Sequence, residues 1–179
     1  MDQTASSPSF FNTSLLSRVR RNHALEHATM HILGRTHRNL RLVGNASFDG
    51  FYVYGAIPTE NLRAAAEQGL QALKNGQAQM AIHPNCGSNL VVAGLLTGLG
   101  VFLTMGGLAK KPPKGFLARL SYLPLAITTA IAGIFLAKPL GTMVQAHITT
   151  DAQVGDMQIV GIIQDTLFGI PRHHIRTEG

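Results

Sequence analysis

The sequence of 179 residues has no tryptophan, one cysteine and few charged side chains. A single cysteine excludes an intrachain disulfide framework, so packing and hydrogen bonds must hold the fold together. Charged residues make up 13% of the chain, roughly half of the share that is usual in soluble domains. The shortage is uneven, because long stretches carry no charge at all. This unevenness predicts more about the fold than the total does.

Aromatic residues are also scarce, at 6% of the chain. They do not alternate with the basic residues, which argues against a nucleic-acid surface built by base stacking. The formal net charge is nevertheless +6. A basic surface without aromatic residues predicts contact with anionic lipid. Much of the positive charge lies on or near one predicted helix, in Arg18, Arg20, Arg21, Arg35, Arg38 and Arg41.

Two stretches without a charged residue, Leu90–Ala109 and Leu120–Ala137, predict membrane-spanning helices. The short basic link between them predicts an antiparallel transmembrane hairpin. The alternative is a buried helical pair in a soluble core. Gly94 and Gly98 form a G-x-x-x-G pair, which is typical of close helix association in membranes. We therefore expect a homo-oligomer or a larger membrane complex.

The rest of the chain has the pattern of alternating helices and short strands. A helical pattern begins near Ser14 and ends at Gly34, and a second helix follows Pro58 with Thr59 as its N-cap. Runs of β-branched and aromatic residues predict strands, and the segments 44–50 and 170–171 predict turns. The predicted strands are 41–43, 51–54, 79–82, 157–163 and 174–177.

The predicted fold class is α+β, a small mixed domain interrupted by a transmembrane helical hairpin. The mixed domain comprises a His-rich N-terminal helix, a β-hairpin, a helix, a strand and C-terminal strands. The predicted boundaries are a flexible terminus over 1–13, a metal-site domain over 14–88 and 140–179, and the hairpin over 89–139. The first residues lack the basic region and apolar run of a cleaved signal peptide.

One predicted helix carries the motif H-x-x-E-H at His23, Glu26 and His27. Residues four apart lie one turn above each other, so both imidazoles can face one point. Two neutral imidazoles with a carboxylate beside them suit zinc or another divalent transition metal, with Glu26 as general base. His31 lies one turn further along and is a candidate third ligand. The alternative is a solvated polar face on which Glu26 balances nearby arginines.

A second candidate group lies in the turn His83-Pro84-Asn85-Cys86-Gly87-Ser88. His83 and Cys86 are both good zinc ligands. The alternative is that the turn only caps the following helix and that Cys86 is a small buried hydrophobic residue. Asp151 and Asp156 are candidate carboxylate ligands or partners that orient an imidazole, although a role in turns is commoner for such residues.

These motifs resemble a known family. The H-A-L-E-H helix, the H-P-N-C-G-S turn before an apolar helix and the segment Thr149-Thr150-Asp151 occur in the same order in the YqhQ-like proteins. Those are bacterial multi-pass membrane proteins of unknown function, for which a metal-dependent activity has been suggested. The chain is also similar to shorter, two-span relatives known only as a domain of unknown function. The resemblance implies a bacterial inner or internal membrane, and one site containing His23, Glu26, His27, His83 and Cys86.

Two functions follow from the sequence. The first is an integral membrane protein with a zinc-type site at the membrane interface, acting as a metal-dependent hydrolase with Glu26 as general base. The second is a membrane subunit or assembly factor without enzymatic activity, whose closed metal site is structural. The sulfur of Cys86 favours the second, because zinc sites with cysteine ligands are more often closed. The expected partners are a lipid bilayer and further membrane proteins, not nucleic acid.

Overall fold

The computed structural model describes residues 14–37, 40–107 and 115–179. These residues form two compact units. The mixed unit contains the described residues up to His83 and from Gln145 onward, and the helical unit contains those from Pro84 to Val144. The predicted terminus over 1–13 and the basic link at 110–114 lie outside the described residues.

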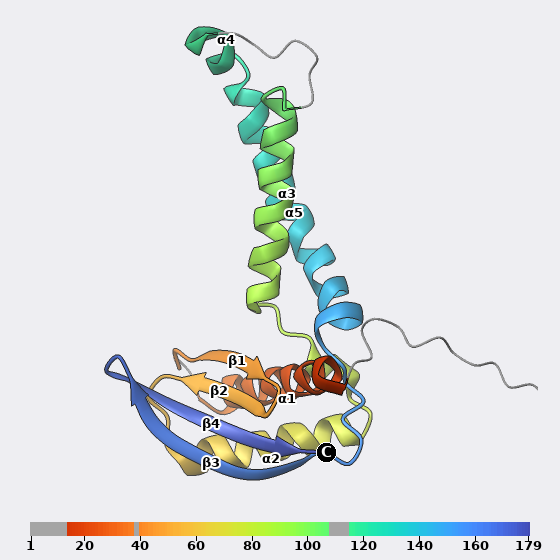
Figure 1. The fold of residues 1–179 in the computed structure, drawn as a ribbon, viewed down its shortest axis with the longest axis vertical. Coiled ribbons are helices and arrows are strands. Elements are labelled where there is room, and N and C mark those ends of the chain that lie inside the picture. The colour runs from red at the N-terminus through yellow and green to blue at the C-terminus, as the bar shows by residue number, and fades with distance from the viewer. Residues whose placement is uncertain (1–13, 38–39, 108–114) are drawn as a thin grey trace, which may run out of the picture. The chain divides into compact units, whose positions relative to one another are not determined.

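The mixed unit combines helices with one antiparallel sheet whose strand order is β1-β2-β4-β3 (Figure 1). The last strand of the chain therefore lies between the first hairpin and β3. Segments from before and after the helical unit are thus joined in a single sheet, as the α+β prediction requires. The elements of this unit are α1 (Ser14–Thr36), β1 (Val43–Ser47), β2 (Gly50–Tyr54), α2 (Thr59–Lys74), η2 (Ala78–Ala81), η3 (Gln145–Thr149), β3 (Gln158–Leu167) and β4 (Ile170–Glu178).

The core of the mixed unit lies between one face of the sheet and the two long helices. Along β2, Phe51 and Val53 are fully buried while Tyr52 and Tyr54 are only partly buried, as the two-residue period of a strand requires. Cross-strand pairing places Phe51 opposite Ile175 of β4, which is also fully buried. Burying a side chain of this size contributes about 1.5–3 kcal/mol. The helices supply Ala24, Leu25, Ala28, Leu33, Leu62, Ala65, Ala66, Leu70 and Leu73 to the same core.

The buried side chain of Asn22 connects α1 to the strands β1 and β4. The Asn22 side-chain amide donates to the Ser47 carbonyl over 2.8 Å, and the Thr177 hydroxyl donates to the Asn22 amide oxygen over 2.6 Å. The Asn22 amide thus has a partner at its nitrogen and at its oxygen, which a buried amide needs to avoid a desolvation penalty. The contact fixes the part of α1 that carries the following residue, His23.

The helical unit contains α3 (Gly87–Thr104), α4 (Phe116–Leu120) and α5 (Leu123–Val144). Helices α3 and α5 approach closely where glycines leave room. A Cβ atom at Gly133 would lie 3.0 Å from the Thr97 side chain, and one at Gly100 would lie 2.6 Å from that of Thr129. Gly94 and Gly98 have nothing within 4 Å of such an atom, so the G-x-x-x-G pair is not used between α3 and α5.

The two long helices of this unit are long and apolar enough to cross a membrane. No residue of α3 is buried, and α5 buries only small residues, Ala126, Gly133, Ala137 and Gly141. Large apolar side chains are instead exposed along both helices, as Leu90, Leu95 and Phe135 show. The first predicted span ends outside the described residues, and the second begins at Leu123 rather than Leu120.

Several predicted boundaries in the mixed unit are wrong. The segment 79–82, predicted as a strand, contains the helical turn η2. Met80 and Ala81 are buried there, and the carbonyls of Ala81 and Ile82 accept hydrogen bonds from histidines of α1 rather than from a neighbouring strand. Helix α1 continues through Gly34 to Thr36, since one glycine in a helix costs only about 1 kcal/mol.

One predicted turn is shorter than expected, and the other lies two residues earlier in the chain. Strand β1 occupies 43–47, so the turn predicted over 44–50 is reduced to Phe48 and Asp49. Strand β4 starts at Ile170, and the turn before it is Phe168-Gly169. Pro171 is tolerated in the strand because it lies beside the hairpin end, opposite Thr166.

The predicted N-cap of α2 is also wrong. The capping position belongs to Pro58, and the Thr59 hydroxyl donates to the Gln164 side-chain oxygen on β3 over 3.0 Å. A contact between two distant segments thus replaces a local one.

We expect Phe51→Ala to lower the free energy of unfolding by about 3–5 kcal/mol, because it leaves a cavity between the sheet and α1. Denaturant titration of the purified protein in detergent, followed by circular dichroism, measures this change. The matched control is Phe48→Ala, whose side chain is 54% exposed and should matter by less than about 0.5 kcal/mol. Equal losses in the two variants would contradict the assignment of the core.

Candidate metal centre

Four histidines gather at one side of α1. His23 and His27 lie one turn apart, with ring centroids 4.3 Å from each other. His83, which follows η2, lies 5.7 Å from His27 and 4.9 Å from His31 by the same measure. The structure thus brings the three predicted helix histidines together with the predicted turn histidine.

A backbone carbonyl holds the ring of His27. Its Nδ1 atom lies 2.6 Å from the Ala81 carbonyl oxygen. A carbonyl can only accept, so Nδ1 carries the proton and Nε2 keeps its lone pair. This Nε2 atom is buried and has no hydrogen-bond partner among the described residues. A histidine fixed through one nitrogen, with the other unprotonated, has the arrangement of a metal ligand.

The other two helix histidines are held in the same way. The Nδ1 atom of His23 lies 2.9 Å from the carbonyl of Thr149 in the π-helical turn η3. The Nε2 atom of His31 lies 2.7 Å from the carbonyl of Ile82. In the neutral imidazoles, the carbonyl contacts therefore place the proton of His23 on Nδ1, as in His27, and that of His31 on Nε2.

His83 is neutral at physiological pH. Burial, followed by the nearby charges of His31 and His27, lowers the pKa of His83 to about 4. Its backbone N–H donates to the Gln145 side-chain oxygen over 2.8 Å, which fixes the turn. A neutral imidazole is the form that binds metal.

Glu26 is buried beside the histidines, with 7% of its surface exposed. One carboxylate oxygen lies 3.9 Å from Nε2 of His23. The other side of the carboxylate packs on Gly44 of β1, where a Cβ atom would overlap Glu26 Oε1. The Glu26 carboxylate therefore occupies the space that a side chain at position 44 would fill. No spacing rule in the sequence signals this role of Gly44.

Cys86 belongs to the helical unit and occupies the N-cap position of α3. The Ser88 hydroxyl donates to its sulfur over 3.1 Å. His23 and His27 offer imidazoles and Cys86 offers a thiol, and each of these groups is of a type that could hold a metal ion.

Other predicted residues have structural contacts. The Asp151 carboxylate accepts a hydrogen bond from the Gln153 backbone N–H over 3.0 Å, which is a turn contact. The Arg20 guanidinium donates to the carbonyls of His147 and Thr150 over 3.2 and 3.1 Å. This arginine therefore stabilises the π-helical turn η3, whose Thr149 carbonyl accepts the hydrogen bond from His23.

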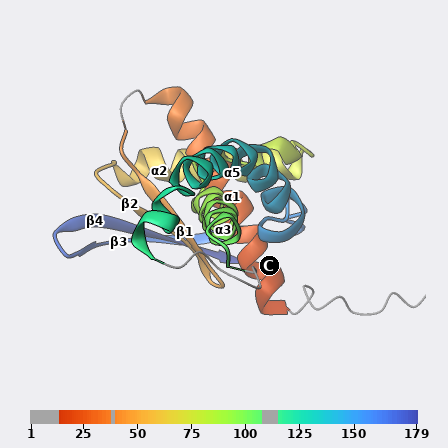
Figure 2. The same ribbon diagram turned by 90° about the horizontal axis from the view of Figure 1, so that it is seen from above.

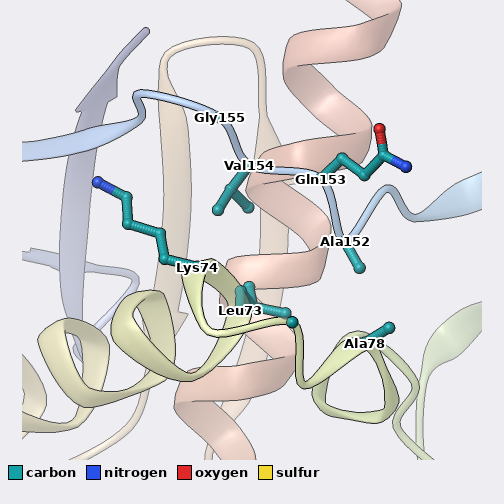
Figure 3. A pocket seen from close by; sticks show the side chains of 8 residues that line it. Leu73, Lys74, Ala78, Ala152, Gln153, Val154 and Gly155 are labelled. Atoms are coloured by element: carbon teal, nitrogen blue, oxygen red, sulfur yellow. The ribbon is translucent and has the colours of Figure 1, made fainter.

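A separate hollow in the mixed unit has no such chemistry. Figure 3 shows it between the end of α2 and the segment Ala152–Gly155, with Lys74 and Gln153 among its lining side chains. Lys74 is the one charged residue that lines it, and none of the histidines does. The histidine cluster, rather than this hollow, is the candidate functional site.

We expect Gly44→Ala to lower the free energy of unfolding by about 1–3 kcal/mol, because the added methyl group displaces the Glu26 carboxylate. The control is Gly34→Ala, where nothing lies within 4 Å of the new atom. That exposed helical position should gain about 0.5–1 kcal/mol. Thermal unfolding monitored by circular dichroism separates the two, and a neutral Gly44→Ala would contradict the packing of Glu26.

Comparisons with known proteins cover this site and both apolar helices. A family model described as a domain of unknown function, DUF6391, matches residues 18–162. An uncharacterized protein of Picosynechococcus sp. strain PCC 7002 is 34% identical over 169 residues, covering 88% of this chain and 78% of that protein. No solved structure matches. The expected relation to a domain of unknown function is confirmed, and the chain belongs to the DUF6391 family.

Proposed function

We propose that this protein is an integral membrane protein whose mixed unit binds a zinc-type divalent metal ion. The observation that carries the proposal is the buried Nε2 atom of His27, which no described residue satisfies while Nδ1 is fixed on Ala81. Leaving such an atom unpaired costs about 1–3 kcal/mol. Metal binding recovers this cost and uses the tautomer that the Ala81 carbonyl selects.

The proposed ligands are His23 and His27, with Cys86 and His83 completing the set and His31 as a further candidate. Cys86 lies three positions after His83 in the sequence, and an extended chain of that length spans only about 10 Å. The thiol therefore stays close to His83 through the chain itself. A set of imidazoles and one thiol suits zinc and excludes magnesium and calcium, which prefer oxygen.

The hydrolase proposal depends on Glu26. A zinc ion held by His23 and His27 would supply Lewis-acid chemistry, which is the activation of water and of a carbonyl group. The carboxylate of Glu26, 3.9 Å from Nε2 of His23, is placed to accept a proton beside the ligands. The Gly44 contact orients this carboxylate, and the carbonyls of Ala81 and Thr149 keep the two imidazoles in their ligating tautomers.

The alternative is a closed structural site in a membrane subunit or assembly factor without enzymatic activity. The thiol of Cys86 favours it, because zinc sites of the hydrolase type use histidine and carboxylate ligands. The four histidines also provide enough nitrogen donors to fill every position. The resemblance of the motif order to that of YqhQ-like proteins supports a metal in either function.

We expect purified wild-type protein to contain roughly one zinc ion per chain, measured by mass spectrometry of the metal content. His27→Gln should lose the metal, and Glu26→Gln should keep it. His147→Gln is the matched control, because its exposed ring lies outside the cluster. Equal metal content in wild type and His27→Gln would contradict the site.

Cobalt substitution extends the same experiment to the two alternatives. A sulfur-to-cobalt absorption band that Cys86→Ser removes would establish the thiol ligand. A change in the visible spectrum on adding azide shows an exchangeable position, as the hydrolase requires. A spectrum that azide leaves unchanged favours the closed site.

The membrane proposal rests on α3 and α5. Their apolar side chains are exposed along both helices, and in water this exposure would be unfavourable by about 25 cal/mol per Å². A bilayer removes this cost, and both helices are long enough to cross it. A bacterial inner or internal membrane is the proposed location.

We expect the protein to stay in the membrane pellet after alkaline carbonate washing, because two spanning helices cannot be released without disrupting the bilayer. Fractionation of membranes that contain the full chain measures this. As a matched test, Leu95→Arg together with Phe135→Arg should reduce insertion, while Phe48→Arg, an exposed position outside the helical unit, should not. Release of the wild-type chain by carbonate would contradict the proposal.

A further inference from the structure

The tip of the β3–β4 hairpin carries the most exposed large apolar side chain of the mixed unit. Phe168 is 95% exposed, and Ile170 beside it is 51% exposed. The hairpin extends beyond β1 and β2 (Figure 2), so the tip stands clear of the rest of the sheet. A phenylalanine at this position gains nothing from the core of the protein.

The backbone makes this choice of residue unusual. Phe168 has a φ of +50°, and no other non-glycine residue of the described chain has a positive φ. Turns of this kind favour asparagine or glycine at such a position, because a larger side chain is strained there. Strain in a residue without packing partners suggests that the side chain acts outside the fold.

An ion pair without net charge lies just behind the tip. Asp165 of β3 pairs with Arg172 of β4 across the ladder, and Arg172 Nε donates to Asp165 Oδ1 over 2.8 Å. Beyond this pair the strands contain only Thr166, Leu167, Ile170 and Pro171. The end of the hairpin is therefore an apolar cap without net charge.

The size of this cap decides which partner fits. A stable protein interface buries about 800 Å² on each side, which one two-residue turn and its neighbours cannot supply. Bilayer interfaces, by contrast, accept single aromatic side chains. We propose that the hairpin tip inserts Phe168 and Ile170 into the interfacial region of a lipid bilayer, as an attachment separate from α3 and α5. This inference rests on the proposed membrane insertion of the same chain.

The absence of tryptophan from the chain allows a direct test. Phe168→Trp places the sole indole at the tip, and the full-length protein is reconstituted into phosphatidylcholine–phosphatidylglycerol vesicles. Bromine atoms on the upper acyl chains should reduce its fluorescence about twofold, and aqueous iodide should have little effect. Phe48→Trp in the β1–β2 turn is the matched control, and we expect iodide but not bromine to quench it.

Each other outcome overturns the inference. Quenching of the tip indole by iodide shows a tip in water, and an indole protected from both quenchers shows a protein partner. Ile170→Trp is a second reporter if the first variant does not fold. Carbonate washing of the same vesicles keeps the two proposals apart. Release of the protein refutes membrane insertion itself, whereas a retained protein with a water-exposed indole refutes only the role of the hairpin.

Discussion

The hydrogen bonds between the histidines of α1 and three backbone carbonyls are the constraint on which the candidate site depends. The carbonyls of Ala81, Ile82 and Thr149 each accept from one ring. The first two belong to the end of η2 and the residue that follows it, and the third belongs to η3, far away in the sequence. Because a carbonyl accepts and never donates, these contacts decide which nitrogen of each ring keeps its lone pair. The backbone thus selects the chemistry that the side chains offer.

Two parts of the chain place the same residue types in opposite surroundings. In the mixed unit, leucines and phenylalanines such as Leu62 and Phe51 are fully buried against other side chains. In the helical unit, leucines such as Leu90 and Leu95 remain exposed, and close approach between helices depends on glycine and threonine. The first pattern is that of a close-packed core, and the second occurs on two helices long and apolar enough to cross a membrane. The distribution of charge along the sequence already separates the two.

The sequence predicts features that depend on local periodicity. The spacing of Leu62, Leu70 and Leu73 was sufficient to predict α2, and the order of His23, Glu26 and His27 was sufficient to indicate one face of α1. Features that depend on distant contacts were not predictable. The segment 79–82 is apolar enough for a strand, and only its packing under α1 makes it a helical turn. Gly44 shows the same limit, because its role comes from a carboxylate eighteen positions earlier in the chain.

The position of β4 in the sheet has a consequence for the order in which the molecule can form. This strand follows the other three described strands in the chain, yet it lies between β2 and β3 in the sheet. The carbonyl of Thr149 that holds His23 is also made only after both apolar helices. A nascent chain therefore exposes α1 and the first hairpin without this strand until β4 has been synthesised. Completion of the candidate metal centre is in this way a late event, which follows the synthesis of α3 and α5.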